Sequence, residues 1–306
     1  MYFEGAEKRL SLTLVAASPS LRALGDDFWR RALLKSDTEI LSKLSNEQCD
    51  AYLLSESSLF VWHDNLVLIT CGNTRLIETV LNLIESLGKV QIASLSYQRK
   101  SEILPALQSS RFEDDIARLR GMLSGDAYRI GHLDGHHHHI FFSGSKARHK
   151  SAQTVQMYHI RGELADYLIS DKQTKEGIAS RLNLPELLPG FYVDAHLFSP
   201  LGYSLNALRE DDYFTLHVSP QEASSYVSLE TNLSLGEGLG VIVSELLNRL
   251  NPVSWDVSGF EVEEPEYCAE QYSMQARGEL TLADGRDLYI KHYKQRDCEQ
   301  LLPVTL

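Results

Sequence analysis

Residues 53–73, LLSESSLFVWHDNLVLITCGN, place an acid and two hydroxyls directly before an apolar run. At the mouth of a buried strand, Glu56, Ser57 and Ser58 are typical of a turn or a sheet edge. They also allow a second interpretation, in which a serine hydroxyl attacks the backbone carbonyl that precedes it and the chain breaks there. The residue types alone leave both interpretations open.

The run His136–His139 is the other conspicuous group of chemically active side chains. Neighbouring side chains of an extended strand point to opposite faces, so at most two of these imidazoles easily share a metal. No acid or cysteine partner stands at a spacing familiar from zinc sites. We therefore predict a solvated strand here and no metal site.

Common nucleotide and nucleophile motifs are missing, because the chain contains no GxGxxG, no phosphate loop and no GxSxG. Taken singly, Cys71, Ser204 and His217 are unremarkable, since a lone cysteine or histidine in a strand is usually a structural residue. These patterns indicate a soluble α+β protein and do not name a reaction.

Three segments that could position these residues have helical character. Residues 74–88 carry apolar side chains at helical spacing, and Gly88 suits the C-terminal cap. Residues 239–252 show the same spacing and end at a proline. A shorter helix is predicted from Asp26, where DDFWRRALLKS has an acidic first turn.

Most of the remaining chain predicts strands. SLFVWHDNLVLIT indicates two strands around Asp64-Asn65, and DAYRIGHLDGHHHHIFFS indicates a hairpin with a tight turn at Asp134-Gly135. Other segments alternate or are rich in aromatic and β-branched residues: YFTLHVS, SSYVSLETN, EYCAEQYSMQA and RDLYIKHYK. Residues 144–153 are predicted to form an exposed loop. Strands and long helices without strict alternation favour an antiparallel α+β sandwich, in one domain of residues 1–306 without an internal repeat.

Composition excludes several classes of function. With 29 basic and 42 acidic residues the formal charge is −13, which argues against nucleic acid as a partner. No apolar run reaches the roughly 18 residues that a membrane helix needs, and the first residues do not resemble a signal peptide. The four cysteines form no CxxC pair, so we expect reduced thiols and a cytoplasmic location.

A family resemblance assigns functions to several residues that are unremarkable when taken singly. YLLSESSLFVWHDNLVLITCGNT resembles the self-cleavage segment of the eukaryotic-type S-adenosylmethionine decarboxylases. The similarity recurs, in the same order, at FEGAEK, LLPGFYVDAHLFSPLGYSLNAL and YFTLHVSPQEASSYVSLETNLS. It implies a four-layer αββα sandwich of two antiparallel sheets, with the reactive group between them.

The resemblance implies that the protein makes its own cofactor. Ser57 Oγ would attack the carbonyl of Glu56, leaving a β chain of residues 1–56 and an α chain of residues 57–306 that begins with a pyruvoyl group. His217 matches the family base that removes the serine α-proton. Ser204 matches the processing serine that steadies the ester intermediate.

The remaining site residues are also assigned by resemblance. The pyruvoyl ketone acts as an electron sink when CO2 leaves, and Cys71 matches the proton donor that then protonates Cα. Phe3 and Phe198 match two aromatics that sandwich the adenine of S-adenosylmethionine, a contact worth roughly 0.5–2 kcal/mol where it meets the sulfonium. Glu4 matches an acidic active-site residue, and Leu54 is assigned to the substrate site.

One departure from the family concerns the substrate. Where the family has a glutamate that grips both ribose hydroxyls, this chain has Gln221, followed by Glu222. A glutamine carbonyl still accepts one hydrogen bond, but the charge-assisted pair is weakened.

A second departure concerns activation by putrescine. Two family acids of the putrescine site are replaced by Ala152 and Gln156, and the lysine before TCG is replaced by Ile69. Three other positions of that site keep their residues, namely Glu7, Thr154 and Glu230. Arg9 stands where plant-type members supply a cation in place of putrescine. We predict a putrescine-insensitive enzyme.

Three functions therefore compete. The first is pyruvoyl-dependent decarboxylation of S-adenosylmethionine for spermidine synthesis. The second keeps the self-processing but acts on ornithine or arginine, which Gln221 allows and the Phe3–Phe198 pair opposes. The third is a non-catalytic regulatory subunit, which retention of Ser57, Cys71 and His217 opposes. The family includes monomers and dimers, so a homodimer stays open.

Overall fold

The strands form two eight-stranded antiparallel sheets in the described part of the chain. The computed structural model describes residues 5–133, 135–144, 152–221, 224–234, 238–260 and 270–297. The first sheet has the spatial order β2 (Ile40–Ser45), β3 (Asp50–Leu54), β4 (Ser57–Val61), β5 (Asn65–Thr70), β1 (Lys8–Leu14), β6 (Ile92–Lys100), β8 (His138–Gly144) and β7 (Asp126–Ile130). The second has the order β10 (Tyr192–Leu197), β11 (Tyr203–Arg209), β12 (Asp212–Ser219), β13 (Tyr226–Thr231), β9 (Gln153–Tyr158), β14 (Ser254–Phe260), β16 (Asp287–Gln295) and β15 (Tyr272–Thr281).

The second sheet repeats the topology of the first. Each strand of the second sheet occupies the place of the strand eight numbers earlier in the first sheet, from one edge to the other. No convincing repeat is visible in the sequence, so this repetition of the strand order was not predicted. A sheet fixes which positions are apolar but tolerates many residue types there, so two halves can share an architecture without visibly similar sequences.

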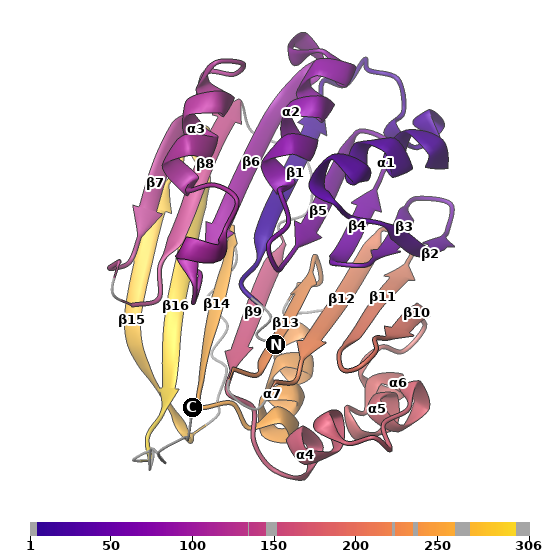
Figure 1. Cartoon of the computed structure of the whole chain (residues 1–306), viewed down its shortest axis with the longest axis vertical. Helices are drawn as coiled ribbons and strands as arrows, with labels where there is room; N and C mark the ends of the chain where they lie inside the picture. The colour runs from indigo at the N-terminus through magenta and orange to yellow at the C-terminus, as the bar shows by residue number, and fades with distance from the viewer. Residues whose placement is uncertain are drawn as a thin grey trace.

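Helices cover the outer face of each sheet, which gives the predicted four-layer αββα sandwich (Figure 1). On the first sheet these are α1 (Asp26–Leu33), α2 (Leu76–Leu87) and α3 (Phe112–Arg120). On the second they are α4 (Glu163–Ile169), α5 (Lys175–Arg181), α6 (Leu184–Leu187) and α7 (Leu239–Leu250). Short 3₁₀ turns lie at Leu21–Leu24, Leu34–Ser36, Lys89–Gln91 and Pro105–Leu107.

The two largest apolar cores lie between each sheet and its helices. The apolar stripe of α2 packs on Leu10 and Leu68 of the first sheet, and that of α7 packs on Leu229 and Val257 of the second. These two helices lie where the periodic patterns predict them, and Gly88 ends α2 with a φ of 82°. Burial of these stripes is the main reason why both helices form.

The layer between the sheets is more polar than the two outer cores. One apolar cluster there contains Phe60 and Tyr213, whose ring centroids are 4.7 Å apart, and another contains Phe142 and Phe260. Ion pairs also cross this layer, such as Arg9 to Glu230 at 2.6 Å. Polar groups buried in this layer need hydrogen-bond partners, and several find them on the facing sheet. These contacts fix the position of one sheet relative to the other.

Several local predictions need correction. The hairpin of β7 and β8 is present, but seven residues separate the two strands, so the predicted tight turn is wrong. Only His138 and His139 of the histidine run are in the strand, and His138 is buried rather than solvated. The sequence did not indicate α3 to α6, because these helices are short. Asp134, Cys268, Cys298, residues 145–151 of the predicted loop and most of EYCAEQ lie outside the described residues.

Candidate active site

Strand ends from both sheets converge on a cavity of about 360 Å³ between the sheets. The turn from β3 to β4 contributes Glu56 and Ser57, and the end of β5 contributes Cys71. Strands β11 and β12 contribute Ser204 and His217 from the facing sheet. The loops after β10 and β12 complete the lining with a set that includes Phe198, Ser199, Pro200, Gln221 and Pro220. A cavity of this volume is within the usual range for small-molecule sites.

Ser57 is the first residue of β4 and has an unusual backbone. Its φ is 129°, although it is not a glycine. Such a conformation costs on the order of 1–3 kcal/mol and persists only when the surroundings impose it. The side chain is buried, and its Oγ lies 3.0 Å from Nε2 of His217. Strain and a paired hydroxyl therefore coincide at one residue.

His217 is surrounded by hydroxyl groups. Its Nε2 also lies 2.9 Å from Thr215 Oγ1 and 3.3 Å from Ser58 Oγ, and its Nδ1 lies 2.8 Å from Ser204 Oγ. Burial lowers the pKa of His217 to about 3. The imidazole is therefore neutral near pH 7, and one of its nitrogens carries a free lone pair that can accept a proton.

The backbone carbonyl of Glu56 has two donors from one residue. The N–H of Cys71 donates to this oxygen at 3.2 Å, and the thiol Sγ lies 3.5 Å from it. Donors placed on a carbonyl oxygen stabilise negative charge that develops there during attack. Burial raises the pKa of the Glu56 side chain, while the Lys8 ammonium opposes that shift.

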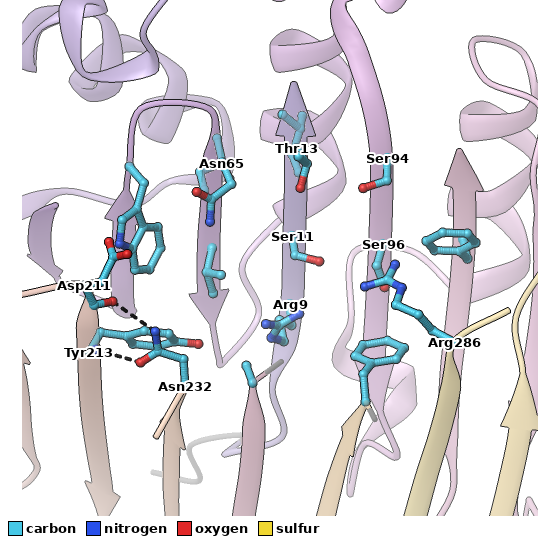
Figure 2. A pocket seen from close by; sticks show the side chains of 17 residues that line it. Arg9, Ser11, Thr13, Asn65, Ser94, Ser96, Asp211, Tyr213, Asn232 and Arg286 are labelled. Atoms are coloured by element: carbon cyan, nitrogen blue, oxygen red, sulfur yellow. Dashed lines mark hydrogen bonds between the residues drawn. The ribbon is translucent and has the colours of Figure 1, made fainter. Parts of the chain in front are cut away.

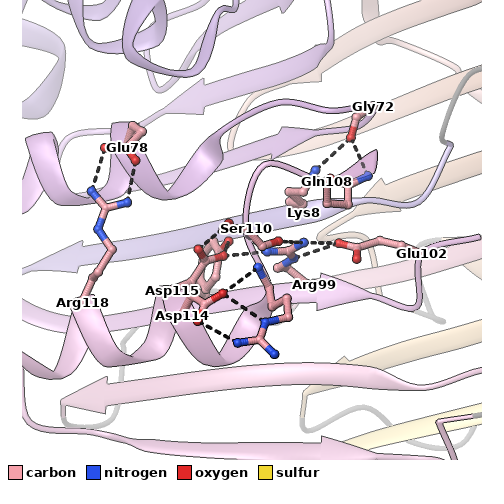
Figure 3. A network of polar contacts seen from close by, with 12 residues as sticks. Lys8, Gly72, Glu78, Arg99, Glu102, Gln108, Ser110, Asp114, Asp115 and Arg118 are labelled. Atoms are coloured by element: carbon pink, nitrogen blue, oxygen red, sulfur yellow. Dashed lines mark hydrogen bonds and ion pairs between the residues drawn. The ribbon is translucent and has the colours of Figure 1, made fainter. Parts of the chain in front are cut away.

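A polar network anchors the turn that carries Cys71 (Figure 3). Lys8 is buried and donates from Nζ to the carbonyl of Gly72 at 2.8 Å. Gln108 Nε2 lies 3.4 Å from the same oxygen and 3.3 Å from Asn73 Oδ1. Because two side chains from other elements hold the residues after Cys71, the thiol keeps its place beside the Glu56 carbonyl.

The predicted substrate residues fall into three groups. Phe198 and Gln221 line the cavity, and the Phe198 ring lies edge-on to His196 at 4.6 Å. The Leu54 side chain is fully buried in the outer core of the first sheet and does not line the cavity. A contact from Leu54 to a ligand would have to come from its backbone. Phe3 and Glu4 lie outside the described residues.

Sequence reasoning missed three polar residues behind His217. Ser58 Oγ donates to Asn206 Oδ1 at 2.6 Å, and Thr215 Oγ1 lies 3.0 Å from the same oxygen. All three side chains are fully buried. Asn206 stands two residues after Ser204, and Thr215 stands two residues before His217, in strands that are otherwise apolar. Because side chains two residues apart share one face of a strand, this spacing was a signal that could have indicated both residues.

A second, smaller cavity of about 110 Å³ lies farther along the layer between the sheets (Figure 2). Arg9, Ala152 and Tyr213 are among its lining residues. Arg9 makes a two-point ion pair with Glu230 at 2.6 and 3.1 Å. Tyr213 and Thr154 also donate to Glu230, at 2.6 and 3.1 Å. The carboxylate is therefore already neutralised by a cation of the chain itself.

A neutral imidazole, a thiol and a polarised backbone carbonyl around one cavity define an enzyme of the αββα sandwich type. The family model described as adenosylmethionine decarboxylase matches residues 1–301. The chain belongs to the adenosylmethionine decarboxylase family, whose members are carboxy-lyases that act on S-adenosylmethionine.

Individual relatives agree with this assignment. The chain is 26% identical to the S-adenosylmethionine decarboxylase proenzyme of Dictyostelium discoideum, over 96% of this chain and 86% of that protein. It is 32% identical to the proenzyme of Leishmania donovani, over 75% of this chain and 66% of that protein. A crystal structure of a Trypanosoma brucei AdoMetDC-delta26 monomer superposes with a TM-score of 0.62 at 22% identity, over 78% of this chain and 99% of that one, and supports the fold.

No helix in the described ranges is both long and apolar enough to cross a membrane.

Proposed function

We propose that the protein cuts itself between Glu56 and Ser57, converts Ser57 into a pyruvoyl group, and then decarboxylates S-adenosylmethionine. The products are a β chain of residues 1–56 and an α chain of residues 57–306. The observation that carries the proposal is the pairing of Ser57 Oγ with the neutral His217 imidazole at 3.0 Å. The attacked carbonyl is that of Glu56, which Cys71 holds from the other side.

The self-cleavage uses groups of the chain. Ser57 Oγ bonds to the Glu56 carbonyl carbon while the Cys71 N–H stabilises the oxyanion. The hydroxyl proton passes to the Ser57 nitrogen, and the C–N bond breaks to give an ester and a free amine. His217 then removes the Ser57 α-proton, and the Cβ–Oγ bond breaks to release the Glu56 carboxylate. Hydrolysis of the remaining dehydroalanine gives the pyruvoyl carbonyl and ammonia. Strain at the Ser57 backbone favours this bond rearrangement.

Decarboxylation needs an electron sink, a proton donor and a substrate site. Once formed, the pyruvoyl group supplies the electron sink. Cys71 lines the same cavity and supplies the proton that returns to Cα. Phe198 and Gln221 also line the cavity and would bind the adenosine part, together with Phe3 and the backbone of Leu54. Glu4 would act as an acidic active-site residue. A reduced cytoplasmic setting suits this role of Cys71, because the donor has to be a thiol.

Activation by putrescine is not expected in this proposal. A dication binds where buried carboxylates lack a partner. Here Glu230 is paired with Arg9, and Glu7 accepts a hydrogen bond from Gln156 Nε2 at 3.0 Å. Burial raises the pKa of Glu7 to about 7, so its carboxyl group is only partly ionised at neutral pH.

Processing is tested on a denaturing gel. The freshly purified chain should split into pieces of about 6 and 28 kDa, in proportion to 306 residues and 34.5 kDa. The Ser57→Ala variant should stay whole because it lacks the nucleophile. Ser58→Ala is the matched control and should still cut, since Ser57 and His217 remain. An uncut wild-type chain, or a cut Ser57→Ala chain, would exclude the proposal.

Substrate choice is tested separately on the processed enzyme. Release of labelled CO2 from S-adenosylmethionine, ornithine and arginine should favour S-adenosylmethionine. Faster release from ornithine or arginine would keep the self-processing and assign the other substrate class. A processed chain that releases CO2 from none of the three would support the regulatory alternative.

A further inference from the structure

A cluster of two histidines and an aspartate bridges the two sheets away from the proposed active site. It consists of His136 in the connection from β7 to β8, Asp256 on β14 and His292 on β16. One ligand atom from each lies within 4.8 Å of the other two. In the sheet order β13 and β9 separate these strands from β12, which carries His217. We propose that His136, Asp256 and His292 bind a divalent transition metal ion, with Zn²⁺ as the expected ion.

Two of the three ligands are fixed by strand pairing. Asp256 and His292 are direct cross-strand partners in the antiparallel pair of β14 and β16. His292 Nδ1 lies 2.5 Å from Asp256 Oδ1. Cross-strand partners have Cβ atoms about 5 Å apart and point to the same face of the sheet. Asp256 and His292 can therefore share an ion without a rearrangement of the backbone. The His292 side chain is partly exposed, which lets it move back by the roughly 0.8 Å that separates this contact from the ligand spacing of a zinc site.

The third ligand comes from the other sheet's hairpin. The His136 ring stacks on the His292 ring, with centroids 4.3 Å apart and planes at 26°. Its Nδ1 lies 3.3 Å from Asp256 Oδ2, and its ring also meets Tyr158 edge-on at 4.7 Å. A ligand separation of 3.3 Å is close to that of two ligands about 2.0–2.1 Å from one zinc ion.

The other groups around Asp256 suit an outer layer of the site. Lys100 Nζ is bonded to Asp256 Oδ2, and Tyr158 OH lies 3.2 Å from the same oxygen. Oδ2 also faces His136, and Oδ1 faces His292, so each oxygen of the carboxylate lies beside one imidazole. Ligating carboxylates are usually oriented by such second partners. The Lys100 charge repels a cation, so we expect weaker affinity than for a site with several anionic ligands.

The rest of the histidine run is directed elsewhere. His137 Nδ1 lies 2.9 Å from the Gly135 carbonyl, and His139 stacks on Phe112 at 4.7 Å. His138 is buried on β8. The sequence analysis expected no metal because no acid stood at a familiar spacing. The acid is supplied by Asp256, 120 residues later in the chain.

The chemistry of the ligands selects the class of ion. Imidazole nitrogens with one carboxylate suit Zn²⁺, Co²⁺ and Ni²⁺, whereas Mg²⁺ and Ca²⁺ prefer oxygen ligands throughout. Three protein ligands leave one position for water, and His136 is exposed enough for solvent to reach it. An ion here would tie the β7–β8 hairpin of the first sheet to the second sheet.

The test is a titration of the full chain, stripped with a chelator, with ZnCl2 by calorimetry and with CoCl2 by visible absorption. We expect one Zn²⁺ per chain at this site and the absorption bands of Co²⁺ bound to nitrogen and oxygen. His136→Ala should weaken Zn²⁺ binding at least about 10-fold, in line with the loss of a ligand or its partner. His137→Ala, the neighbour in the same loop, should bind as the wild type does.

A thermal melt separates loss of the site from loss of the fold. Zn²⁺ should raise the Tm of the wild type and of His137→Ala, because a ligand that binds only the native state stabilises it. It should not raise the Tm of His136→Ala or His292→Ala, and both variants should melt cooperatively without metal. Equal Zn²⁺ binding by His136→Ala and the wild type would overturn the proposal. So would equal loss in His137→Ala, which would assign binding to the histidine run as a whole.

Discussion

Ser57, His217 and Cys71 show how residue-scale chemistry depends on distant contacts. His217 is neutral because β12 buries it, and its two ring nitrogens are held by Ser57 and Ser204 from different sheets. Cys71 contacts the Glu56 carbonyl oxygen through its backbone N–H and through its thiol. A substitution of the side chain removes only the second of these contacts. In the proposed mechanism the backbone donor serves the cleavage, and the thiol serves the later protonation.

A change at Cys71 should therefore separate the two reactions. In Cys71→Ala the backbone N–H at 3.2 Å from the Glu56 oxygen remains, so the chain should still cut, although more slowly. The proton donor is lost, and decarboxylation should fall by about 10²–10⁴-fold, the usual contribution of a positioned acid. A denaturing gel measures the first effect and CO2 release from labelled S-adenosylmethionine the second. Cys49→Ala is the control, since Cys49 is a buried core residue away from the cavity.

The site residues illustrate what sequence can and cannot predict at this scale. Ser57 and Cys71 stand fourteen residues apart, yet nothing in their spacing distinguishes them from core residues. Their assignment, like that of Ser204 and His217, depended on the family resemblance. Asn206 was not predicted by either route, because its role depends on contacts across the sheets that no local pattern encodes.

At the scale of elements, the strongest local patterns predicted the structure best. Helices α2 and α7 have long apolar stripes and lie where the sequence places them. Helix α3 has only nine residues and a highly charged sequence, so its pattern was too weak. Its position instead depends on a buried polar network in which Asp115 accepts from Arg99 and Tyr97 (Figure 3).

That network predicts a large effect of one substitution on stability. Asp115 is fully buried, and its Oδ2 lies 2.8 Å from Arg99 Nη1. Asp115→Ala should lower the free energy of unfolding by at least about 2 kcal/mol, because Arg99 and Tyr97 both lose a buried acceptor. The Arg99 charge keeps its ion pair with Glu102, so the loss should be smaller than for a fully uncompensated buried charge. Urea denaturation measures this. Arg118→Ala in the same helix breaks only an exposed pair with Glu78, and should cost less than about 1 kcal/mol. Similar losses of unfolding free energy in Asp115→Ala and Arg118→Ala would contradict the expected difference between a buried and an exposed ion pair.

At the scale of the whole molecule, two sheets with the same topology meet through a polar layer. The fold class was predictable because strand alternation and the resemblance agreed. The repeated topology was not predictable, because the two halves share the order of their strands but no recognisable sequence similarity. Both cavities and the histidine–aspartate cluster lie in the layer between the sheets, because charged residues from one half find their partners on the other half.

The response to putrescine tests this layer. We expect millimolar putrescine to change the decarboxylation rate by less than about twofold, because Arg9 already neutralises Glu230 and a second cation would have to displace it. Steady-state CO2 release with and without putrescine measures this. Spermidine at the same concentration controls for ionic effects of polyamines. A several-fold rise with putrescine alone would show that the Arg9–Glu230 pair opens.

Acid stability tests the buried histidines of both sheets together. Burial lowers the pKa of His217 to about 3 and of His139 to about 4, and it lowers the pKa of His138 well below the ordinary value. In the unfolded chain these groups titrate near pH 6.5. Between pH 6.5 and the folded values, the unfolded state binds protons that the native state does not, so stability should fall as the pH falls.

Two carboxyl groups, Glu7 and Glu56, work in the opposite direction, because burial raises the pKa of each. The pKa of Glu7 is raised to about 7, so the native state keeps its proton between pH 4.5 and 7, and acidification in that window favours folding. Three histidines against these two carboxyl groups predict a net loss of stability on acidification, on the order of a few kcal/mol. Urea midpoints at pH 7.5, 6 and 5 measure it. The midpoint should decrease at each step, and His139→Phe should reduce the decrease. A urea midpoint that rises toward pH 5 would mean that the carboxyl groups outweigh the histidines in their effect on stability. It would also mean that burial does not keep His138, His139 and His217 neutral.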